Sequence, residues 1–201
     1  MLLYLRARKT LRALAIIGAV QVVILATGAT KVPFLSLADG GSVQLPAALL
    51  LPVLAAAAVA YSVAAPTSVL ERVAVRPLQR LDAVLVLGYC LFLLVSGGLL
   101  WTAGVDLAAE STRNALGFVG ATCLAVRFLG PGPGTTILPV YVLLSVASGG
   151  ARRPRPWTWF LVQDAGPRDV TIALLLLGLG LLCWSSQERT GGSRGFPQTA
   201  V

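Results

Sequence analysis

The stretch that decides the fold is AVLVLGYCLFLLVSGGLLWTAG, from Ala83 to Gly104. It contains no charged residue, and it is long enough for a helix that crosses the roughly 30 Å hydrocarbon core of a membrane. We expect an all-α, polytopic membrane helix bundle, with about six spans near 11–30, 46–65, 83–104, 113–129, 135–148 and 170–185. These spans form one transmembrane domain over residues 1–186, and a polar, disordered cytoplasmic tail follows over 187–201.

The composition supports a membrane protein. Of 201 residues, 56% are hydrophobic and 12% are charged, and the mean hydropathy is +0.82. A soluble domain of this size needs more polar surface. The net charge of +8 lies in short clusters between apolar runs, as in loops that orient a membrane protein. Basic stripes interleaved with aromatic residues are missing from the sequence, so we expect no nucleic-acid partner.

Basic residues near the start of the chain indicate its orientation. Four of them precede the apolar run from Ala13 to Ala29: Arg6, Arg8, Lys9 and Arg12. They place the N-terminus in the cytoplasm of a cell-membrane protein. The segment from Tyr4 to Leu14 also suits an interfacial helix on the inner membrane surface, and both roles can hold together. A cleaved signal peptide is the alternative, with only a weak cleavage site before Lys31.

The loops between spans carry most of the remaining charge. The loop from Pro66 to Asp82 is predicted to be cytoplasmic because spans alternate, and its charged residues are Glu71, Arg72, Arg76 and Arg80. The segment from Lys31 to Leu45 is rich in turn-forming residues and is expected to be an outer loop.

The number of crossings is open between five and six. The run from Gly130 to Gly134 is predicted to be a turn between helices, because it lacks the lysine of a phosphate-binding loop and its prolines lack N–H donors. The apolar run that follows is short. Six crossings place Arg152, Arg153 and Arg155 outside, against the positive-inside tendency, whereas five crossings place them inside. Charge alone therefore favours five.

Residues that carry chemistry are sparse. The chain has no histidine, and its three cysteines lie inside apolar runs. No nucleophile, base or ligand cluster is recognisable, so we expect no enzyme activity, no metal and no cofactor.

Four polar residues in or near spans are candidates for a substrate path: Asn114, Arg127, Tyr89 and Tyr141. Each also has a structural interpretation. Asn114 would cap a helix whose Gly117 and Gly120 pack closely against a neighbour, Arg127 would extend its head group to water, and the tyrosines would bond a neighbouring backbone.

Aromatic residues follow the arginines before the last span. Trp157, Trp159 and Phe160 are expected to lie at head-group level, in a re-entrant or interfacial segment. Pro154 and Pro156 disfavour a helix in the stretch before them.

Several segments together resemble the small six-span permease subunits of ABC exporters, in the version common in actinomycetes. The stretch LERVAVRPL, from Leu70 to Leu78, is similar to the family's loop between the second and third spans. RNALGF, from Arg113 to Phe118, continuing to RFLG at Arg127–Gly130, is similar to its fourth span. A proline-containing fifth span, a Trp-x-Trp connection and a final span follow in the expected order.

The resemblance implies a permease that moves a substrate outward, as a homodimer or as a heterodimer with a second permease in membrane lipid. A separate P-loop ATPase subunit would dock on the first cytoplasmic loop, which makes Glu71, Arg72, Arg76 and Arg80 the coupling residues. The family's outer re-entrant hairpin also makes arginines on that side acceptable, which favours six spans. The alternative is a non-transporting membrane protein, such as an immunity, assembly or scaffold protein.

Overall fold

The computed structural model describes residues 2–27, 30–36, 41–63, 78–148, 155–163 and 166–185. Three of the expected coupling residues, Glu71, Arg72 and Arg76, lie outside the described residues, as does the expected tail at 187–201. Arg80 lies in the first turn of a described helix, but its side chain is not described.

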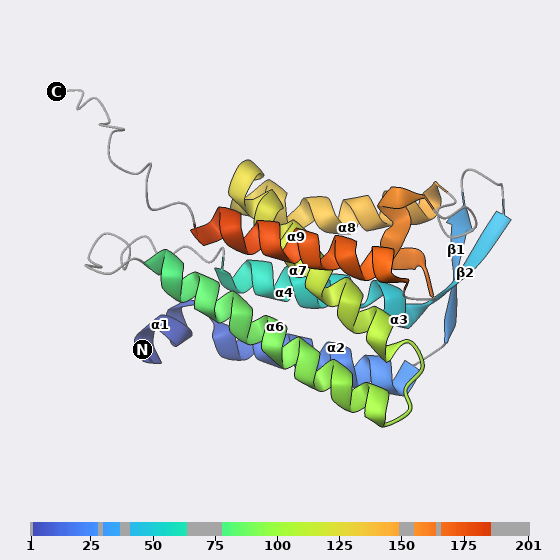
Figure 1. The fold of residues 1–201 in the computed structure, drawn as a ribbon, viewed down its shortest axis with the longest axis horizontal. Coiled ribbons are helices and arrows are strands. Elements are labelled where there is room, and N and C mark those ends of the chain that lie inside the picture. Colours follow the sequence, from blue (N-terminus) through green and yellow to red (C-terminus); the bar gives the residue numbers. More distant parts are fainter. Residues whose placement is uncertain are drawn as a thin grey trace.

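Helices make up most of the described chain (Figure 1). The elements in order are α1 (Leu2–Ala7), α2 (Thr10–Thr27), β1 (Lys31–Ser36), β2 (Gly41–Pro46), α3 (Ala47–Leu50), α4 (Pro52–Val63), α6 (Leu78–Thr102), α7 (Ala108–Leu129), α8 (Pro131–Ala147), the 3-10 helix η1 (Pro156–Leu161) and α9 (Pro167–Ser185).

Three helical segments of the described chain are long and apolar enough to cross a membrane: Thr10–Thr27, Leu81–Thr102 and Pro167–Ser185. At about 1.5 Å per residue, they extend roughly 27 to 33 Å. The segments Ala47–Val63 and Pro131–Ala147 are apolar but shorter. Helix α7 is long, but it contains Glu110, Arg113 and Arg127. The protein therefore has the helices of a membrane protein.

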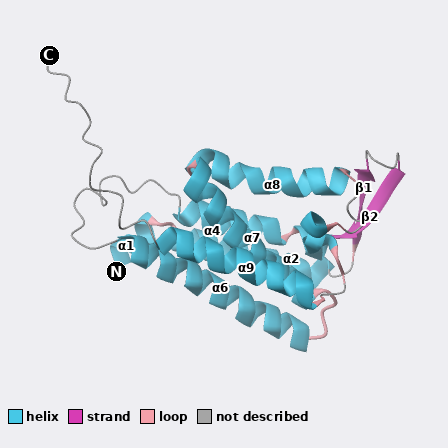
Figure 2. Cartoon of the chain, turned by 45° about the horizontal axis from the view of Figure 1, so that its top comes forward, coloured by secondary structure: helices cyan, strands magenta, loops and turns pink. Residues whose placement is uncertain are grey.

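The long elements run side by side along one axis and alternate in direction (Figure 1). Helix α1 lies at one end of the bundle, which we call the α1 end. The two strands lie at the other, which we call the hairpin end (Figure 2). Helices α2, α6 and α8 run toward the hairpin end, and α4, α7 and α9 run back. Helix α9 thus ends at the α1 end.

The segment expected to be an outer loop contains a β-hairpin. Strands β1 and β2 pair antiparallel, with Lys31 opposite Pro46 and Ser36 opposite Gly41. In β2, Val43 and Leu45 are buried whereas Ser42 and Gln44 are exposed. This alternation is the period of a strand with one packed face. Turn-forming residues dominate the composition of this segment and obscure its alternating apolar residues.

The turn between α7 and α8 is shorter than the glycine-proline run predicts. The chain breaks at Gly130, whose φ of 86° is readily adopted only by glycine, and α8 already begins at Pro131. Pro131 and Pro133 fall in the first turn of α8, where backbone N–H groups have no partner within the helix. The prolines therefore start the helix instead of delaying it.

Helix α7 forms the centre of the bundle, in contact with α4, α6, α8 and α9. From Arg113 to Gly120 every residue is buried. A Cβ at Gly120 would lie 2.4 Å from the backbone of Leu176, and one at Gly134 would lie 2.4 Å from Val126 Cα. Glycines therefore allow α7 to approach both α9 and α8 closely, as small residues do at helix interfaces in membranes.

Candidate functional site

A buried cluster of polar side chains lies at the α1 end. Arg8 Nη2 donates to Asp82 Oδ2 at 2.6 Å, and the two side chains are 4% and 5% exposed. Arg8 Nη1 donates to the carbonyl oxygen of Val63 at 2.7 Å. Tyr4 Oη donates to Asp82 Oδ1 at 2.5 Å. These contacts join α1, the segment just after it, the last residue of α4 and the first turns of α6.

Two further hydroxyl groups extend this cluster into the bundle. Ser62 Oγ donates to the carbonyl oxygen of Arg8 at 2.6 Å, and Ser62 Oγ and Tyr89 Oη share a hydrogen bond of 2.8 Å. We call the five residues Tyr4, Arg8, Ser62, Asp82 and Tyr89 the brace.

The brace satisfies groups that would otherwise be costly to bury. A guanidinium and a carboxylate out of water need both a partner and hydrogen bonds. The Arg8 guanidinium also donates to the backbone carbonyl of Val63 in α4, which adds a hydrogen bond to the ion pair. Partial burial and the hydrogen bond to Asp82 raise the pKa of the Tyr4 hydroxyl, which keeps it a donor.

The position of the brace in the chain makes it a candidate functional site. Val63 directly precedes the connection 64–77, and Asp82 lies in the first turns of α6, which follows it. Arg8 therefore holds together the two helix ends from which the expected coupling loop arises. This contact is long-range in sequence, since 74 residues separate Arg8 from Asp82.

The four basic residues expected on an interfacial helix have different environments. Arg6 and Arg12 are exposed, whereas Arg8 is 3% exposed and belongs to the brace. The helix expected over this segment is interrupted at Lys9, whose φ is 51°. Lys9 Nζ donates to Tyr61 Oη at 2.6 Å. The segment thus packs against α4 instead of presenting all four charges to lipid.

The four candidates for a substrate path do not come together. Tyr89 is buried in the brace at the α1 end. Arg127 is in the last turn of α7 and is partly exposed. Asn114 is near the start of α7, and Tyr141 is in α8.

Asn114 has its side chain fully engaged within the protein. It is 0% exposed, and its Nδ2 donates to the carbonyl oxygens of Phe160 at 2.7 Å and Leu49 at 3.2 Å. Its Oδ1 accepts from Arg113 Nε and Nη2. Asn114 therefore ties α7 to α3 and to η1, and this leaves no polar atom of its side chain for a substrate.

Two of the three aromatic side chains of this connection pack inside the bundle, and their depth in a membrane stays a prediction. Trp159 is 5% exposed and Phe160 is 0% exposed, and both rings contact Phe118 of α7. Only Trp157 is half exposed. Tyr141 Oη donates to the carbonyl oxygen of Trp157. The sequence signal for an interface, aromatic rings beside arginines, does not distinguish these buried rings from exposed ones.

Three cavities between neighbouring elements of the described chain have mostly apolar walls. One of about 450 Å³ is bounded by α7, α8, α9 and η1, and one of about 370 Å³ by β1, α3, α4 and α8. A third, of about 360 Å³, lies between α6, α7 and α9 and is lined in part by Arg113.

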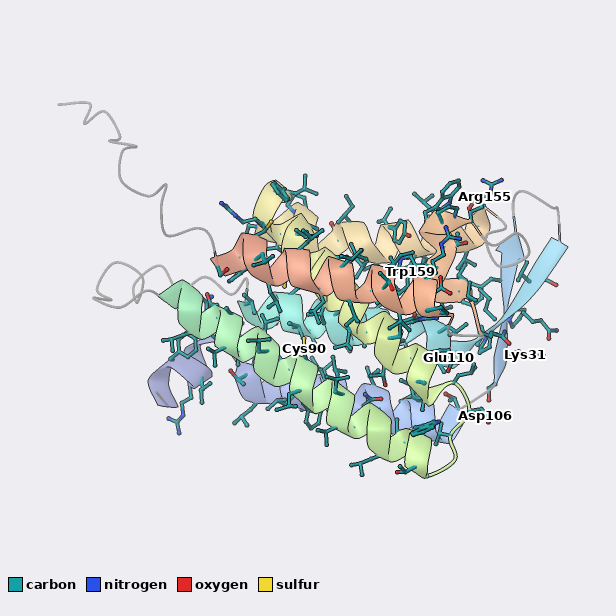
Figure 3. The ribbon with its side chains drawn as sticks, viewed as in Figure 1. Lys31, Cys90, Asp106, Glu110, Arg155 and Trp159 are labelled. Atoms are coloured by element: carbon teal, nitrogen blue, oxygen red, sulfur yellow. The ribbon has the colours of Figure 1, made fainter. Side chains whose placement is uncertain are left out.

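Charged residues at the hairpin end include Lys31, Asp106, Glu110 and Arg155 (Figure 3).

Within the described residues, no cluster of three or more histidine, cysteine, aspartate or glutamate side chains is placed to hold a metal ion. Cys90 and Cys123 are buried free thiols. In comparisons with protein-family models, curated proteins and solved structures, nothing matches this chain. The brace, the distribution of charges and the arrangement of the helices are the features that bear on function.

Asp82 is not among the site residues that the sequence predicts, because in the sequence it ends a charged loop. The sequence does contain a signal for Asp82: it is a single acidic residue at the start of a long apolar run, and two basic clusters precede that run. An ionisable residue at the edge of a span usually has a partner of opposite charge. Which arginine supplies that partner depends on the tertiary fold.

Proposed function

We propose that the chain is a six-span permease subunit of an exporter, powered by a separate P-loop ATPase that docks on the connection 64–77. The observation that carries this proposal is the brace. A partner bound to this connection would act on a segment whose two ends are held by Arg8 through Val63 and Asp82. A movement of the bound partner would then be transmitted to α4 and α6 at the same time.

The six spans would be α2, α3 with α4, α6, α7, α8 and α9, which alternate in direction (Figure 1). Helix α7 is shielded from lipid by its neighbours, so it need not be as apolar as the others. The 17 residues of α8 extend about 26 Å, close to the hydrocarbon thickness.

The charges support an α1 end that faces the cytoplasm. Among the described residues, segments at the α1 end contain these basic residues: Arg6, Arg8, Lys9, Arg12, Arg80 and Arg127. The acidic residue described there is Asp82. At the hairpin end, the described basic residues are Lys31, Arg113, Arg155 and Arg168, and the described acidic residues are Asp106, Glu110 and Asp169. Basic residues are thus more numerous at the α1 end even with six spans.

The test is co-purification from membranes in a mild detergent. The native chain is expected to retain a P-loop ATPase, and Arg76→Glu is expected to release it by reversing a charge in the docking segment. Arg168→Glu is the matched control, because Arg168 is an exposed arginine at the hairpin end. Absence of any P-loop protein from the native preparation, or its retention by Arg76→Glu, would contradict the proposal.

One observation favours the second candidate, a non-transporting membrane protein such as an immunity, assembly or scaffold protein. Helix α7 fills the centre of the bundle, and Asn114, Arg127, Tyr89 and Tyr141 line no common path. A permease with this fold would need to move its substrate between two copies or beside a second permease. ATP-dependent flux in vesicles containing the chain and its ATPase supports the permease. Activity in cells that lack every partner ATPase supports the alternative.

A further inference from the structure

Gln21 places an amide side chain within the apolar helix α2. Among the three segments that are long and apolar enough to cross a membrane, it is the one asparagine or glutamine. Helix α2 runs from Thr10 to Thr27, so Gln21 lies about 17 Å from one end of the helix and about 9 Å from the other. In the membrane placement proposed above, this depth is inside the hydrocarbon core, where water does not satisfy a polar group.

Only part of the hydrogen-bonding capacity of Gln21 is used within the chain. Its Nε2 donates to Ser96 Oγ on α6 at 3.0 Å, and Ser96 Oγ donates to the carbonyl oxygen of Leu93 at 3.2 Å. An amide has two N–H donors and one oxygen that accepts. Across the part of the chain that the structure describes, neither Oε1 of Gln21 nor its second N–H has a partner. Gln21 is partly exposed, and the bundle does not enclose its Oε1.

The surface around Gln21 is apolar and leaves room for another helix. Val22 and Leu25, also on α2, are 64% and 54% exposed. Gly18 lies one turn before Gln21 on the same side of the helix, and a Cβ at Gly18 would meet nothing within 4 Å. A glycine at such a position allows a second helix backbone to approach closely.

We propose that a second copy of this chain binds to this face of α2, with the two Gln21 side chains paired across a two-fold axis. Two copies inserted in the same direction are related by an axis along the membrane normal, so the two Gln21 side chains lie at the same depth. The inference rests on the membrane placement proposed above and is independent of the ATPase partner.

The chemistry of the amide favours this occupant. An amide is self-complementary, so the second N–H of each Gln21 donates to Oε1 of the other, which gives two hydrogen bonds. Each Nε2 keeps its bond to Ser96 of its own chain. A lipid chain on the same face would leave the oxygen and the N–H of Gln21 unsatisfied in the hydrocarbon core, which is costly.

The proposal is tested with the full chain alone in liposomes, by energy transfer between labelled copies at a series of protein-to-lipid ratios. We expect the native chain to dimerise and Gln21→Leu to weaken the association about tenfold or more, because both hydrogen bonds are lost. Ser96→Ala is the matched control. It removes the bond within the chain and leaves the Gln21 amide for the second copy, so it is expected to keep the native association.

A second measurement leaves Gln21 in place. With the three native cysteines replaced by alanine, Val22→Cys is expected to form a disulfide between copies when membranes are oxidised with copper phenanthroline. Leu143→Cys is the control, because Leu143 is 60% exposed at a similar depth on α8, on the other side of the bundle (Figure 1).

The proposal is overturned if the native chain stays monomeric, or if Gln21→Leu associates as tightly as the native chain. It is also overturned if Ser96→Ala weakens the association as much as Gln21→Leu, or if Leu143→Cys cross-links as well as Val22→Cys. Because these assays contain no ATPase, the dimer can form even where the permease proposal fails.

Discussion

At the scale of single residues, the Arg8–Asp82 pair carries the strongest prediction for stability. Asp82→Ala removes the carboxylate from a nearly buried guanidinium, and breaking such a pair costs about 3 to 5 kcal/mol of unfolding free energy. The loss would be measured by unfolding in mixed micelles of dodecyl sulfate and a mild detergent, followed by circular dichroism. Asp106→Ala is the control, since Asp106 is exposed.

The double variant Arg8→Met/Asp82→Leu separates the pair from the loss of one partner. Replacing both charges with apolar groups removes the need to desolvate them, so most of the stability lost in Asp82→Ala is expected to return. A double variant no more stable than Asp82→Ala would show that the pair itself stabilises the fold.

Tyr4 gives a prediction for high pH. Its raised pKa means that the folded state favours the neutral hydroxyl. The stability that the neutral Tyr4 hydroxyl contributes to the folded state is complete below about pH 10, the ordinary tyrosine pKa. It is lost as the pH rises from there toward the higher pKa of the folded state. The native chain is therefore expected to lose stability between about pH 10 and 12, and Tyr4→Phe to lose less. Parallel unfolding curves across this range would contradict the assignment.

The sequence showed that the N-terminal segment is basic, but it did not show which residue is buried. Arg6, Arg8 and Arg12 have the same chemistry and lie within two helical turns. Only the folded chain places Arg8 between Val63 and Asp82, because α1, α4 and α6 meet there. The same limit applies to Asn114, whose partners Leu49 and Phe160 come from distant parts of the chain.

At the scale of elements, the crossing of α7 and α9 depends on glycine. Gly120→Ala places a Cβ about 2.4 Å from the backbone of Leu176 and Leu177, and backbone cannot move aside as a side chain can. We expect a loss of about 1 to 3 kcal/mol, measured as unfolding free energy in detergent. Gly178→Ala on α9 meets nothing within 4 Å and is expected to be neutral or slightly stabilising. Equal effects of the two changes would contradict a close crossing.

Helical content was predictable from apolar runs, but the ends of several elements were not. Helix α7 begins at Ala108, before the expected start at Arg113, because the charged first turns are still helical. Helix α8 includes Pro131 and Pro133 because prolines are tolerated in the first turn. The hairpin was missed because strand alternation over a few residues is a weak signal beside many turn-forming residues.

At the scale of the whole molecule, the membrane class follows from composition, but the number of spans does not. Among the described residues, only three segments are long and apolar by themselves. The remaining helices of the bundle are either short or, like α7, contain charged residues that neighbouring helices enclose. A helix that is enclosed by other helices does not need an apolar surface all round, whereas a hydropathy search assumes that it does. A span count from sequence therefore depends on which helices face lipid, which only the packed bundle reveals.

The side on which Arg155 lies decides the span count. With the three native cysteines replaced by alanine, Arg155→Cys and Lys31→Cys are expected to react with a membrane-impermeant maleimide on intact cells, because both positions are exposed at the hairpin end. Arg6→Cys at the α1 end is expected to react only after permeabilisation. With five spans, Arg155→Cys would instead behave like Arg6→Cys, because α8 would not cross. If Arg155→Cys is labelled under the same conditions as Lys31→Cys, α8 crosses the membrane. The excess of basic residues then lies on the cytoplasmic side, where an ATPase would dock.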